Sequence, residues 1–578
     1  MHRPLWVFLG VAVTLAAGAA VGAGVFYALR QSEGTATTPG AASPTPPPCP
    51  APAAVCREPR VTVETGELRG QCRPAKDGRP EYAAFLGVPY AKAPLGALRF
   101  KSPRPMEPWD GVRDAVLQGP RCLQGAVDKH KGSEDCLHLN VYSPWLQRPH
   151  NDTLLHVLVH VHGGGMVEGS GNPIRPEYFI ANDLVVVTFN YRLSHFGFFN
   201  LDSDLAPGNA GIKDMIAALQ WVHRNIRHFG GDPEKVTVNG CSSAAAAVHW
   251  LALLPETEGL FRAAIIKSGS ALLSWGYSER HRDLSDIAMA FLHALQPAAT
   301  DEQLLHLTND LIADLAFTFA DKHRNKLSPE TRADPTVTVE RRPDGEEPKL
   351  ILRDPESYVL RPARSRIPLL MGITSCEYNP MADMYYLQGE LLNASTDALY
   401  VMLPRSVIPL PDAMADLGLN VSGTYTHNFF EMIGDVQSVM FNLTAVDVNC
   451  DTRCRWEQFL SDIEIKVDTV RSMRLHAREQ QAPVYAYYYE YPLAGPGCAV
   501  HAQDDYLVWP EDEVQVMQLN TTHPLSLNVL RQVTMFTNFV KHGYVRQFIT
   551  YFSRARRLST EECTPVAGNL WSRRTAKC

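Results

Sequence analysis

The stretch Val236-Thr-Val-Asn-Gly-Cys-Ser-Ser-Ala-Ala-Ala-Ala-Val248 decides the fold that this sequence predicts. Its two alternating valines indicate a short buried strand, and the alanine run that begins at Ala244 favours a helix. Gly240 permits a tight turn between the two elements, where a Cβ atom would obstruct the backbone. The sequence therefore predicts a strand, a sharp turn that carries Ser242, and a helix.

Ser242 is a candidate nucleophile because of this predicted turn. A serine at such a bend stands clear of the backbone at a helix N-terminus, where N–H groups can stabilise an oxyanion. The residues Gly240 to Ala244 depart from the pattern G-x-S-x-G at the last position. A serine before an alanine-rich helix is also a common helix cap. The choice between cap and nucleophile therefore depends on the rest of the chain.

Length and composition limit the classes of protein to consider. The chain has 578 residues, 45% of them hydrophobic, and a net charge of −8. This length fits one large α/β domain with appendages. Lys and Arg form no basic stripe outside the C-terminal tail, so we expect no nucleic-acid partner.

The N-terminus predicts a membrane segment. Residues 6–29 carry no charge, lie between Arg3 and Arg30, and are long enough to span a bilayer. We interpret residues 1–30 as an uncleaved signal anchor, with a cleaved signal peptide as the alternative. Both interpretations place the following residues outside the cytosol. We expect a single-pass protein of the cell surface or secretory-pathway membrane, with secretion as the alternative.

Residues 31–58 are rich in Pro, Ala and Thr and predict a stalk. Cys49 and Cys56 in this stalk leave open a link between two chains, a bond to each other, or a bond to Cys72. The 12 cysteines of the chain agree with an oxidising compartment. Candidate glycosylation sites of the type N-x-[ST] agree with it too. They begin at Asn151, Asn393, Asn420, Asn442 and Asn520.

Two further apolar runs predict the class of fold. Residues 156–162 and 184–191 are rich in β-branched side chains and have the character of buried strands. Amphipathic helical stretches follow both runs. Alternation of this kind implies an α/β fold with a mainly parallel central sheet and helices on both faces.

Several segments together resemble the type B carboxylesterase and cholinesterase family, over about residues 60 to 545. They are Phe85 to Phe100, Ser133-Glu-Asp-Cys-Leu to Tyr142, Asn209 to Asp214, Ala218 to Asn225, and Phe229 to Asp232. The resemblance implies the α/β-hydrolase fold for residues 59–545. Residues 546–578 have no clear counterpart in it and form a divergent basic tail.

Candidate partners for Ser242 follow other predicted strands. Glu377 follows a short apolar run that ends at Gly372, and His501 follows the strand-like residues 483–491. The carboxyl ends of neighbouring parallel strands meet at one edge of a sheet. Taken alone, such a glutamate is an ordinary loop residue and such a histidine an ordinary structural one. The order Ser, acid, His is that of this fold, and the resemblance implies Ser242 as nucleophile, His501 as base and Glu377 as the acid.

The residues His162-Gly-Gly-Gly-Met166 follow a predicted strand. A glycine triplet by itself is usually a flexible turn, although its N–H groups are accessible to a carbonyl oxygen. In this position it resembles the oxyanion loop of esterases. The resemblance implies the N–H groups of Gly164, Gly165 and Ser243 as the oxyanion donors.

The resemblance also implies parts of the scaffold. It implies a disulfide between Cys122 and Cys136, and it implies neither a metal nor an organic cofactor. Two buried ion pairs of the family have counterparts here, which are Arg99 with Glu134 and Arg192 with Asp214.

The sequence departs from the family near the candidate site. Cys241 stands where a glutamate is usual, and Tyr378 stands where a glycine is usual. No aromatic residue lies between Cys122 and Cys136, which argues against a choline ester as substrate. Cys241, Cys376 and Cys498 each neighbour a candidate site residue. We interpret them as buried thiols, with a bond between Cys376 and Cys498 as the minor alternative. Asp504 and Asp505 are interpreted as loop residues.

The predicted function is hydrolysis of small-molecule carboxylic esters by a serine hydrolase, through an acyl-enzyme intermediate. The alternative is a catalytically weak adhesion or receptor ectodomain that binds a protein partner, as in the neuroligins and neurotactin of the same family. A slow, ligand-sequestering esterase is a third hypothesis. Fold alone does not separate these functions.

Overall fold

The computed structural model describes a set of ranges that all lie within Cys56–Cys578, the second of the two units into which the chain divides. These ranges are 58–74, 81–124, 132–144, 153–273, 275–278, 289, 293, 297–305, 336–341, 345–360, 367–377, 461–479, 482–493, 498–511, 519, 522–545 and 556–557. The predicted signal anchor, all of the predicted stalk but its last residue, and the sequons at Asn151, Asn393, Asn420, Asn442 and Asn520 lie outside them. No helix within these ranges has the length and apolar character needed to cross a membrane.

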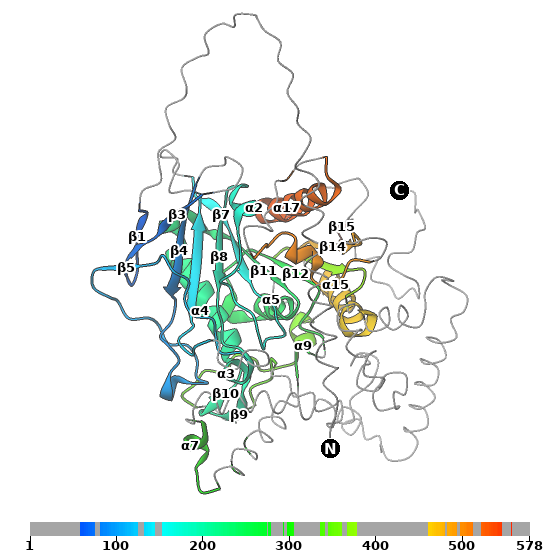
Figure 1. Ribbon diagram of the computed structural model, residues 1–578. Coiled ribbons are helices and arrows are strands. Elements are labelled where there is room, and N and C mark those ends of the chain that lie inside the picture. Colours follow the sequence, from blue (N-terminus) through cyan, green and yellow to red (C-terminus); the bar gives the residue numbers. More distant parts are fainter. Residues whose placement is uncertain are drawn as a thin grey trace, which may run out of the picture. The chain divides into compact units, whose positions relative to one another are not determined.

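A ten-stranded sheet in the order β15-β14-β13-β12-β11-β7-β8-β6-β4-β3 organises the domain (Figure 1). Strands β8, β7, β11, β12, β13 and β14 pair in parallel in that order, while β3, β4, β6 and β15 pair antiparallel. The predicted mainly parallel sheet is therefore correct at its centre. The strands are β3 Gln71–Arg73, β4 Tyr82–Pro89, β6 His138–Ser143, β7 Leu155–Val161, β8 Leu184–Phe189, β11 Gly231–Cys241, β12 Ala263–Lys267, β13 Leu369–Thr374, β14 Val484–Tyr489 and β15 Arg556–Arg557.

Two small sheets accompany the central sheet. The first has the order β1-β2-β5, with β1 Arg60–Val63, β2 Gly66–Arg69 and β5 Val112–Asp114. The second pairs β9 Asn200–Ser203 with β10 Ala206–Pro207. The hairpin of β1 and β2 turns before Gly66, whose φ is 148°.

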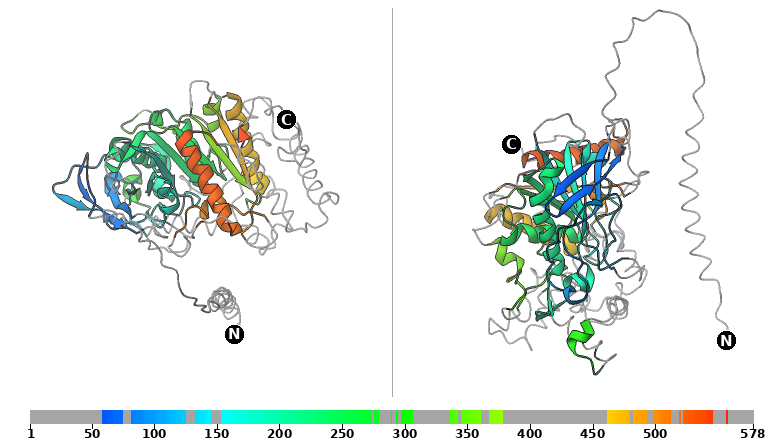
Figure 2. Two further views of the ribbon diagram at one scale, coloured as in Figure 1. Left: turned by 90° about the horizontal axis from the view of Figure 1, so that it is seen from above. Right: turned by 90° about the vertical axis from the view of Figure 1, so that its left-hand side faces the viewer.

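Helices cover both faces of the central sheet. The helices are α2 Glu177–Ile180, α3 Ser194–Phe198, α4 Ala210–Asn225, α5 Ser243–Leu253, α7 Asp301–Leu305, α9 Pro355–Val359, α15 Val467–Glu479, α16 Gln503–Tyr506 and α17 Pro524–His542. Alternate residues of one strand face opposite ways. Val157 and Val159 of β7 therefore join one core with α4 and α5, while Leu158 joins another with α2 and α17. Figure 2 shows α17, in orange-red, beside the sheet.

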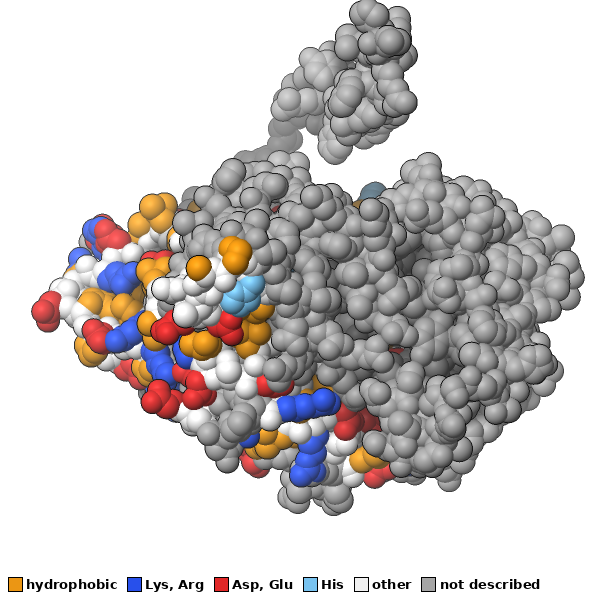
Figure 3. Space-filling view, turned by 90° about the horizontal axis from the view of Figure 1, so that it is seen from below, with side chains coloured by type: hydrophobic (Ala, Val, Ile, Leu, Met, Phe, Trp, Pro, Cys, Tyr) orange, Lys and Arg blue, Asp and Glu red, His pale blue; other side chains and the backbone are white. Residues whose placement is uncertain are grey.

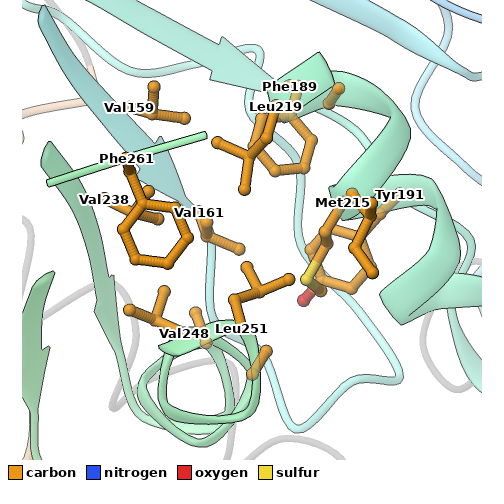
Figure 4. Packing of buried hydrophobic residues seen from close by; sticks show 14 of the residues in the cluster. Val159, Val161, Phe189, Tyr191, Met215, Leu219, Val238, Val248, Leu251 and Phe261 are labelled. Atoms are coloured by element: carbon orange, nitrogen blue, oxygen red, sulfur yellow. The ribbon is translucent and has the colours of Figure 1, made fainter. Parts of the chain in front are cut away.

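The core on the α4 and α5 side holds the strand that leads to Ser242. Figure 4 shows Val159 and Val161 of β7 and Val238 of β11 facing Val248 and Leu251 of α5. All of these side chains are buried. Because each buried branched side chain contributes about 1.5–3 kcal/mol, this packing fixes β11 and α5 firmly on either side of the turn.

The exposed surface has a mixed character where the structure describes it. On the face shown in Figure 3, basic, acidic and apolar side chains alternate in small groups on the coloured part of the surface. Exposed large apolar residues such as Leu95 and Leu117 belong to different segments of the chain.

Candidate active site

Ser242 occupies a strained turn between β11 and α5. Its backbone has φ 61° and ψ −130°, a conformation that costs a non-glycine residue on the order of 1–3 kcal/mol. The Ser242 N–H donates to the Lys267 carbonyl at 2.9 Å, and the Ser242 carbonyl accepts from the Ala245 N–H at 2.9 Å. A Cβ atom at Gly240 would lie 2.5 Å from the Ala244 carbonyl oxygen. The turn therefore needs glycine at 240, and its strain is held by bonds to β12 and α5.

The glycine triplet after β7 lies directly beside this turn. A Cβ atom at Gly163 would lie 3.4 Å from Ser242 Cβ and 2.8 Å from the Cys241 carbonyl oxygen. Gly164 and Gly165 have φ values of 109° and 65°, which favour glycine. Because these residues have no side chains, the backbone of this loop lies close to the turn that carries Ser242.

The same loop is fixed to the start of α5. The Met166 N–H donates to Ser243 Oγ at 3.1 Å. The N–H groups of Gly164 and Gly165 donate no hydrogen bond within the described ranges. The N–H of Ser243 is the first of α5 and has no acceptor within the helix. These three donors are thus free to bind an anion.

His162 supports the loop as a neutral side chain. Burial lowers the pKa of His162 to about 4, so the ring is uncharged at pH 7. Its Nδ1–H donates to the Gly163 carbonyl at 2.9 Å, and the ring stacks on Tyr191 at 4.5 Å between centroids. The Tyr191 hydroxyl donates to the His162 carbonyl at 3.0 Å.

Glu377 and His501 form a hydrogen-bonded pair. His501 Nδ1 lies 2.7 Å from Glu377 Oε2, and the second carboxylate oxygen accepts the Thr374 N–H at 2.6 Å. The Glu377 side chain is fully buried, whereas that of His501 is 23% exposed. Because Nδ1 donates to the carboxylate, Nε2 carries a free lone pair. This imidazole can accept a proton from a group in front of it.

A disulfide joins Cys376 to Cys498, with 5.6 Å between the Cα atoms. The interpretation of these two cysteines as buried thiols is therefore wrong, and the minor alternative of a bond between them is confirmed. The turns after β13 and β14 bring them together, a proximity across 122 residues that no local pattern encodes. Cys241 is the free cysteine of the described part of the chain, and it is buried as expected.

A buried polar network lies beside Cys241. Lys267, at the end of β12, is completely buried and forms an ion pair with Asp505. The Tyr487 hydroxyl donates to Asp504, which is also completely buried. The interpretation of both aspartates as loop residues is therefore wrong, since they lie in α16, where Asp504 is buried and Asp505 pairs with Lys267. A lysine at the end of an apolar strand was the one sequence signal for this network, because buried ammonium groups need a counter-charge.

The charges of this network set the protonation of its members. Burial lowers the pKa of Lys267 in itself, but Asp505 and its other neighbours outweigh burial and hold the pKa above its ordinary value. Burial raises the pKa of Asp504 to about 6 against the effect of Lys267. Burial, reinforced by Asp505, raises the pKa of the Cys241 thiol well above its ordinary range. Cys241 is thus a neutral thiol and no competing nucleophile.

The scaffold contacts that the resemblance implies are present. Cys122 and Cys136 form a disulfide. Arg99 pairs with Glu134 at 2.6 Å, and Arg192 pairs with Asp214 at 2.6 Å. Within the described ranges no cluster of three His, Cys, Asp or Glu side chains could hold a metal ion.

The structure brings the candidate residues together to different degrees. Glu377 contacts His501, and Gly163 lies against Ser242. Ser242 follows β11, Glu377 follows β13 and His501 follows β14; β13 and β14 are adjacent in the sheet, and β12 separates β13 from β11. Ser242 Oγ makes no hydrogen bond to any residue that the structure describes.

Comparisons with known sequences agree on one family. The sequence model of the carboxylesterase family matches residues 57–562. Juvenile hormone esterase of Heliothis virescens is 33% identical over 389 residues, covering 65% of this chain and 68% of that protein. A carboxylic ester hydrolase of Bombus ignitus is 31% identical over 445 residues, covering 75% of each.

Solved structures of esterases share the fold. Juvenile hormone esterase from Manduca sexta, with OTFP covalently attached, superposes with a TM-score of 0.70 at 27% identity, covering 87% of this chain and 93% of that one. Carboxylesterase EST55 of Geobacillus stearothermophilus superposes with a TM-score of 0.65 at 25% identity, covering 87% and 94%. The chain therefore has the α/β-hydrolase fold, belongs to the carboxylesterase family, and is a carboxylic ester hydrolase.

Proposed function

We propose that this protein hydrolyses carboxylic esters through a Ser242–His501–Glu377 triad and an acyl-enzyme intermediate. The observation that carries the proposal is the 2.7 Å contact between His501 Nδ1 and the buried Glu377 carboxylate. This contact leaves Nε2 as a base at the sheet edge where the strained turn presents Ser242. The Manduca sexta relative, in which a ligand is covalently attached, supports covalent catalysis.

The reaction proceeds in two steps. His501 Nε2 takes the proton of Ser242 Oγ as the oxygen attacks the ester carbonyl, and Glu377 offsets the charge of the imidazolium. The N–H groups of Gly164, Gly165 and Ser243 bind the oxyanion. His501 then protonates the leaving alcohol. A water molecule activated by the same imidazole releases the acid and restores Ser242.

Substrate binding completes the hydrogen bond between Ser242 Oγ and His501 Nε2. Catalytic hydrogen bonds are often long or poorly aligned in a free enzyme and tighten in the complex. The position of the oxyanion donors is less dependent on the substrate, because the Met166 N–H to Ser243 Oγ bond already fixes their loop.

Labelling with a fluorophosphonate probe tests the triad. The wild-type protein should be labelled at Ser242 and should hydrolyse p-nitrophenyl esters. Ser242→Ala should lose both properties while keeping its thermal unfolding temperature. Folded wild-type protein that takes no Ser242-dependent label would instead favour the binding ectodomain. Labelling at Ser242 together with a burst of product and little turnover after it would favour the slow, ligand-sequestering esterase.

We further propose that residues 1–30 anchor the protein in a membrane, with residues 31–58 as stalk, 59–545 as the esterase domain and 546–578 as a basic tail. The uncharged residues 6–29 support this anchor. Full-length protein made in secretory cells should partition with membranes after alkaline extraction, and glycosidase treatment should lower its apparent mass. Recovery in the medium with a new N-terminus would show a cleaved signal peptide and a secreted enzyme.

A further inference from the structure

The Cys376–Cys498 disulfide lies at the two turns that carry the proposed acid and base. Cys376 directly precedes Glu377, and Cys498 lies shortly before His501. The bond spans 122 residues of sequence, with 5.6 Å between its Cα atoms. It therefore closes the chain at the place where the carboxylate must meet the imidazole.

Hydrogen bonds next to the disulfide connect the same two turns. The Cys376 N–H donates to the Ala499 carbonyl at 2.8 Å. The Ala499 N–H donates back to Ser375 Oγ at 2.8 Å. Cys376 and Val500 also form an isolated parallel bridge. Beyond the pairing of β13 with β14, which ends at Thr374 and Tyr489, the two turns are thus joined by a few further bonds beside the disulfide.

The contact between Glu377 and His501 depends on the backbone positions of both turns, because these side chains have little freedom to follow a backbone displacement. Glu377 uses one oxygen for the Thr374 N–H and the other for His501. His501 is followed by Ala502, which has a left-handed φ of 60°, an uncommon conformation for a non-glycine residue. A displacement of either turn by about 1 Å would break the 2.7 Å contact, and such displacements can lower rates by about 100-fold.

We propose that the Cys376–Cys498 disulfide is a positioning element of the esterase site, which holds Glu377 against His501 during turnover. This inference rests on the proposed function of the triad. The two sulfur atoms do not touch the reacting atoms. They act on the rate through the backbone of the turns that present the acid and the base.

The test compares two disulfide-free variants. In C376S/C498S we expect kcat for a p-nitrophenyl ester to fall by about 10- to 100-fold with KM changed by less than about threefold. In the matched control C122S/C136S we expect a lower unfolding temperature but a kcat within about threefold of wild type. A structural role alone would lower the unfolding temperature of both variants without a selective loss of kcat.

Reduction of the wild-type protein provides a second measurement if C376S/C498S does not fold. A phosphine gives two electrons to the disulfide, water supplies the two protons, and the products are two thiols and the phosphine oxide. Alkylation and mass spectrometry would identify the opened bond. Opening of Cys376–Cys498 should lower kcat to the same degree, while opening of Cys122–Cys136 alone should not.

Three outcomes would overturn the inference. They are a C376S/C498S kcat within about threefold of wild type, an equal loss of kcat in both variants, or a change confined to KM. If wild type is labelled at Ser242 and C376S/C498S retains its kcat, the inference alone fails. If wild type takes no Ser242-dependent label, the proposed function fails and the inference falls with it.

Discussion

Replacement of Glu377 by glutamine separates the effects of charge and hydrogen bonding from the effect of side-chain shape at the proposed triad acid. The carboxylate accepts two hydrogen bonds, one from the Thr374 N–H at 2.6 Å and one from His501 Nδ1–H at 2.7 Å. A glutamine amide has one acceptor oxygen and one donor NH₂ group. In Glu377→Gln one of these two partners must therefore face a donor.

The more stable arrangement keeps the backbone bond. The amide oxygen then accepts from Thr374, and the NH₂ group donates to His501 Nδ1. This forces the proton of the imidazole onto Nε2, the atom that accepts the Ser242 proton in the proposed mechanism. The wrong tautomer and the lost charge together should lower kcat by about 10³- to 10⁴-fold, which corresponds to about 4–5.5 kcal/mol of transition-state stabilisation.

The assay is steady-state hydrolysis of a p-nitrophenyl ester, with thermal unfolding of the same preparations. KM should change little, because the effect lies on the chemical step. Glu377→Asp is the matched control that restores the charge, and it should recover part of kcat. A folded Glu377→Gln enzyme whose kcat is within about tenfold of wild type would refute the assignment of Glu377 as the acid that orients His501.

Three further predictions concern the surroundings of the site. Lys267→Met leaves the largely buried Asp505 carboxylate, which is 14% exposed, without its counter-charge. We expect urea unfolding to show a free energy of unfolding lower by about 3–5 kcal/mol, largely recovered in K267M/D505L, and an unchanged midpoint would contradict this ion pair. Gly163→Ala places a methyl group 2.8 Å from the Cys241 carbonyl oxygen and 3.4 Å from Ser242 Cβ. We therefore expect kcat to fall at least about tenfold. A wild-type kcat would argue against an oxyanion loop at this position. Acid should destabilise the fold through His249, because burial holds the pKa of His249 in the folded state well below 6.5. The contribution of His249 to stability is complete above pH 6.5. It is lost as the pH falls below 6.5, because the unfolded state then binds a proton that the folded state does not. His249→Gln should flatten the fall in unfolding free energy between pH 7 and pH 5, and an equal slope in both proteins would show that His249 does not titrate on unfolding.

The histidine in the last prediction has a defined hydrogen-bond role. His249 Nδ1 accepts the Ala271 N–H at 3.0 Å, so its Nε2–H donates to His476 Nε2 at 2.6 Å. Both rings are completely buried. The pair thereby joins α5, the helix that follows Ser242, to α15. Protonation of His249 would remove the acceptor of the Ala271 N–H. The native hydrogen bonds therefore require the neutral form of this ring.

Much of the fold could be predicted because its signals are local. The buried strands β7 and β8 appear as β-branched runs, and the alanine run after Ser243 forms α5 as expected. The turn at Ser242 requires a glycine at position 240, and the presence of Gly240 in the sequence predicted a tight turn there. These features depend on backbone conformation and on the spacing of side chains along a few residues, which is information that the sequence carries directly.

The predicted roles of Ser242, Glu377 and His501 depended on resemblance as well as on position. Strand ends alone place many polar side chains at the same sheet edge, and the chain has 20 histidines. The structure supplies the 2.7 Å contact that selects His501 as the partner of Glu377. It does so through the parallel register of β13 and β14, which no single segment defines.

By itself, the sequence determined the class of fold, the order of strands and helices around the serine turn, and the family. Only the tertiary structure decided which distant groups meet, namely Cys376 with Cys498 and Lys267 with Asp505. The physical reason is that secondary structure follows from nearby residues, whereas a disulfide or a buried ion pair depends on the arrangement of whole strands. Interpreted one at a time, these cysteines suggested thiols, and Asp505 suggested a loop residue. The burial of a side chain and the identity of its partner depend on the packing of the whole domain.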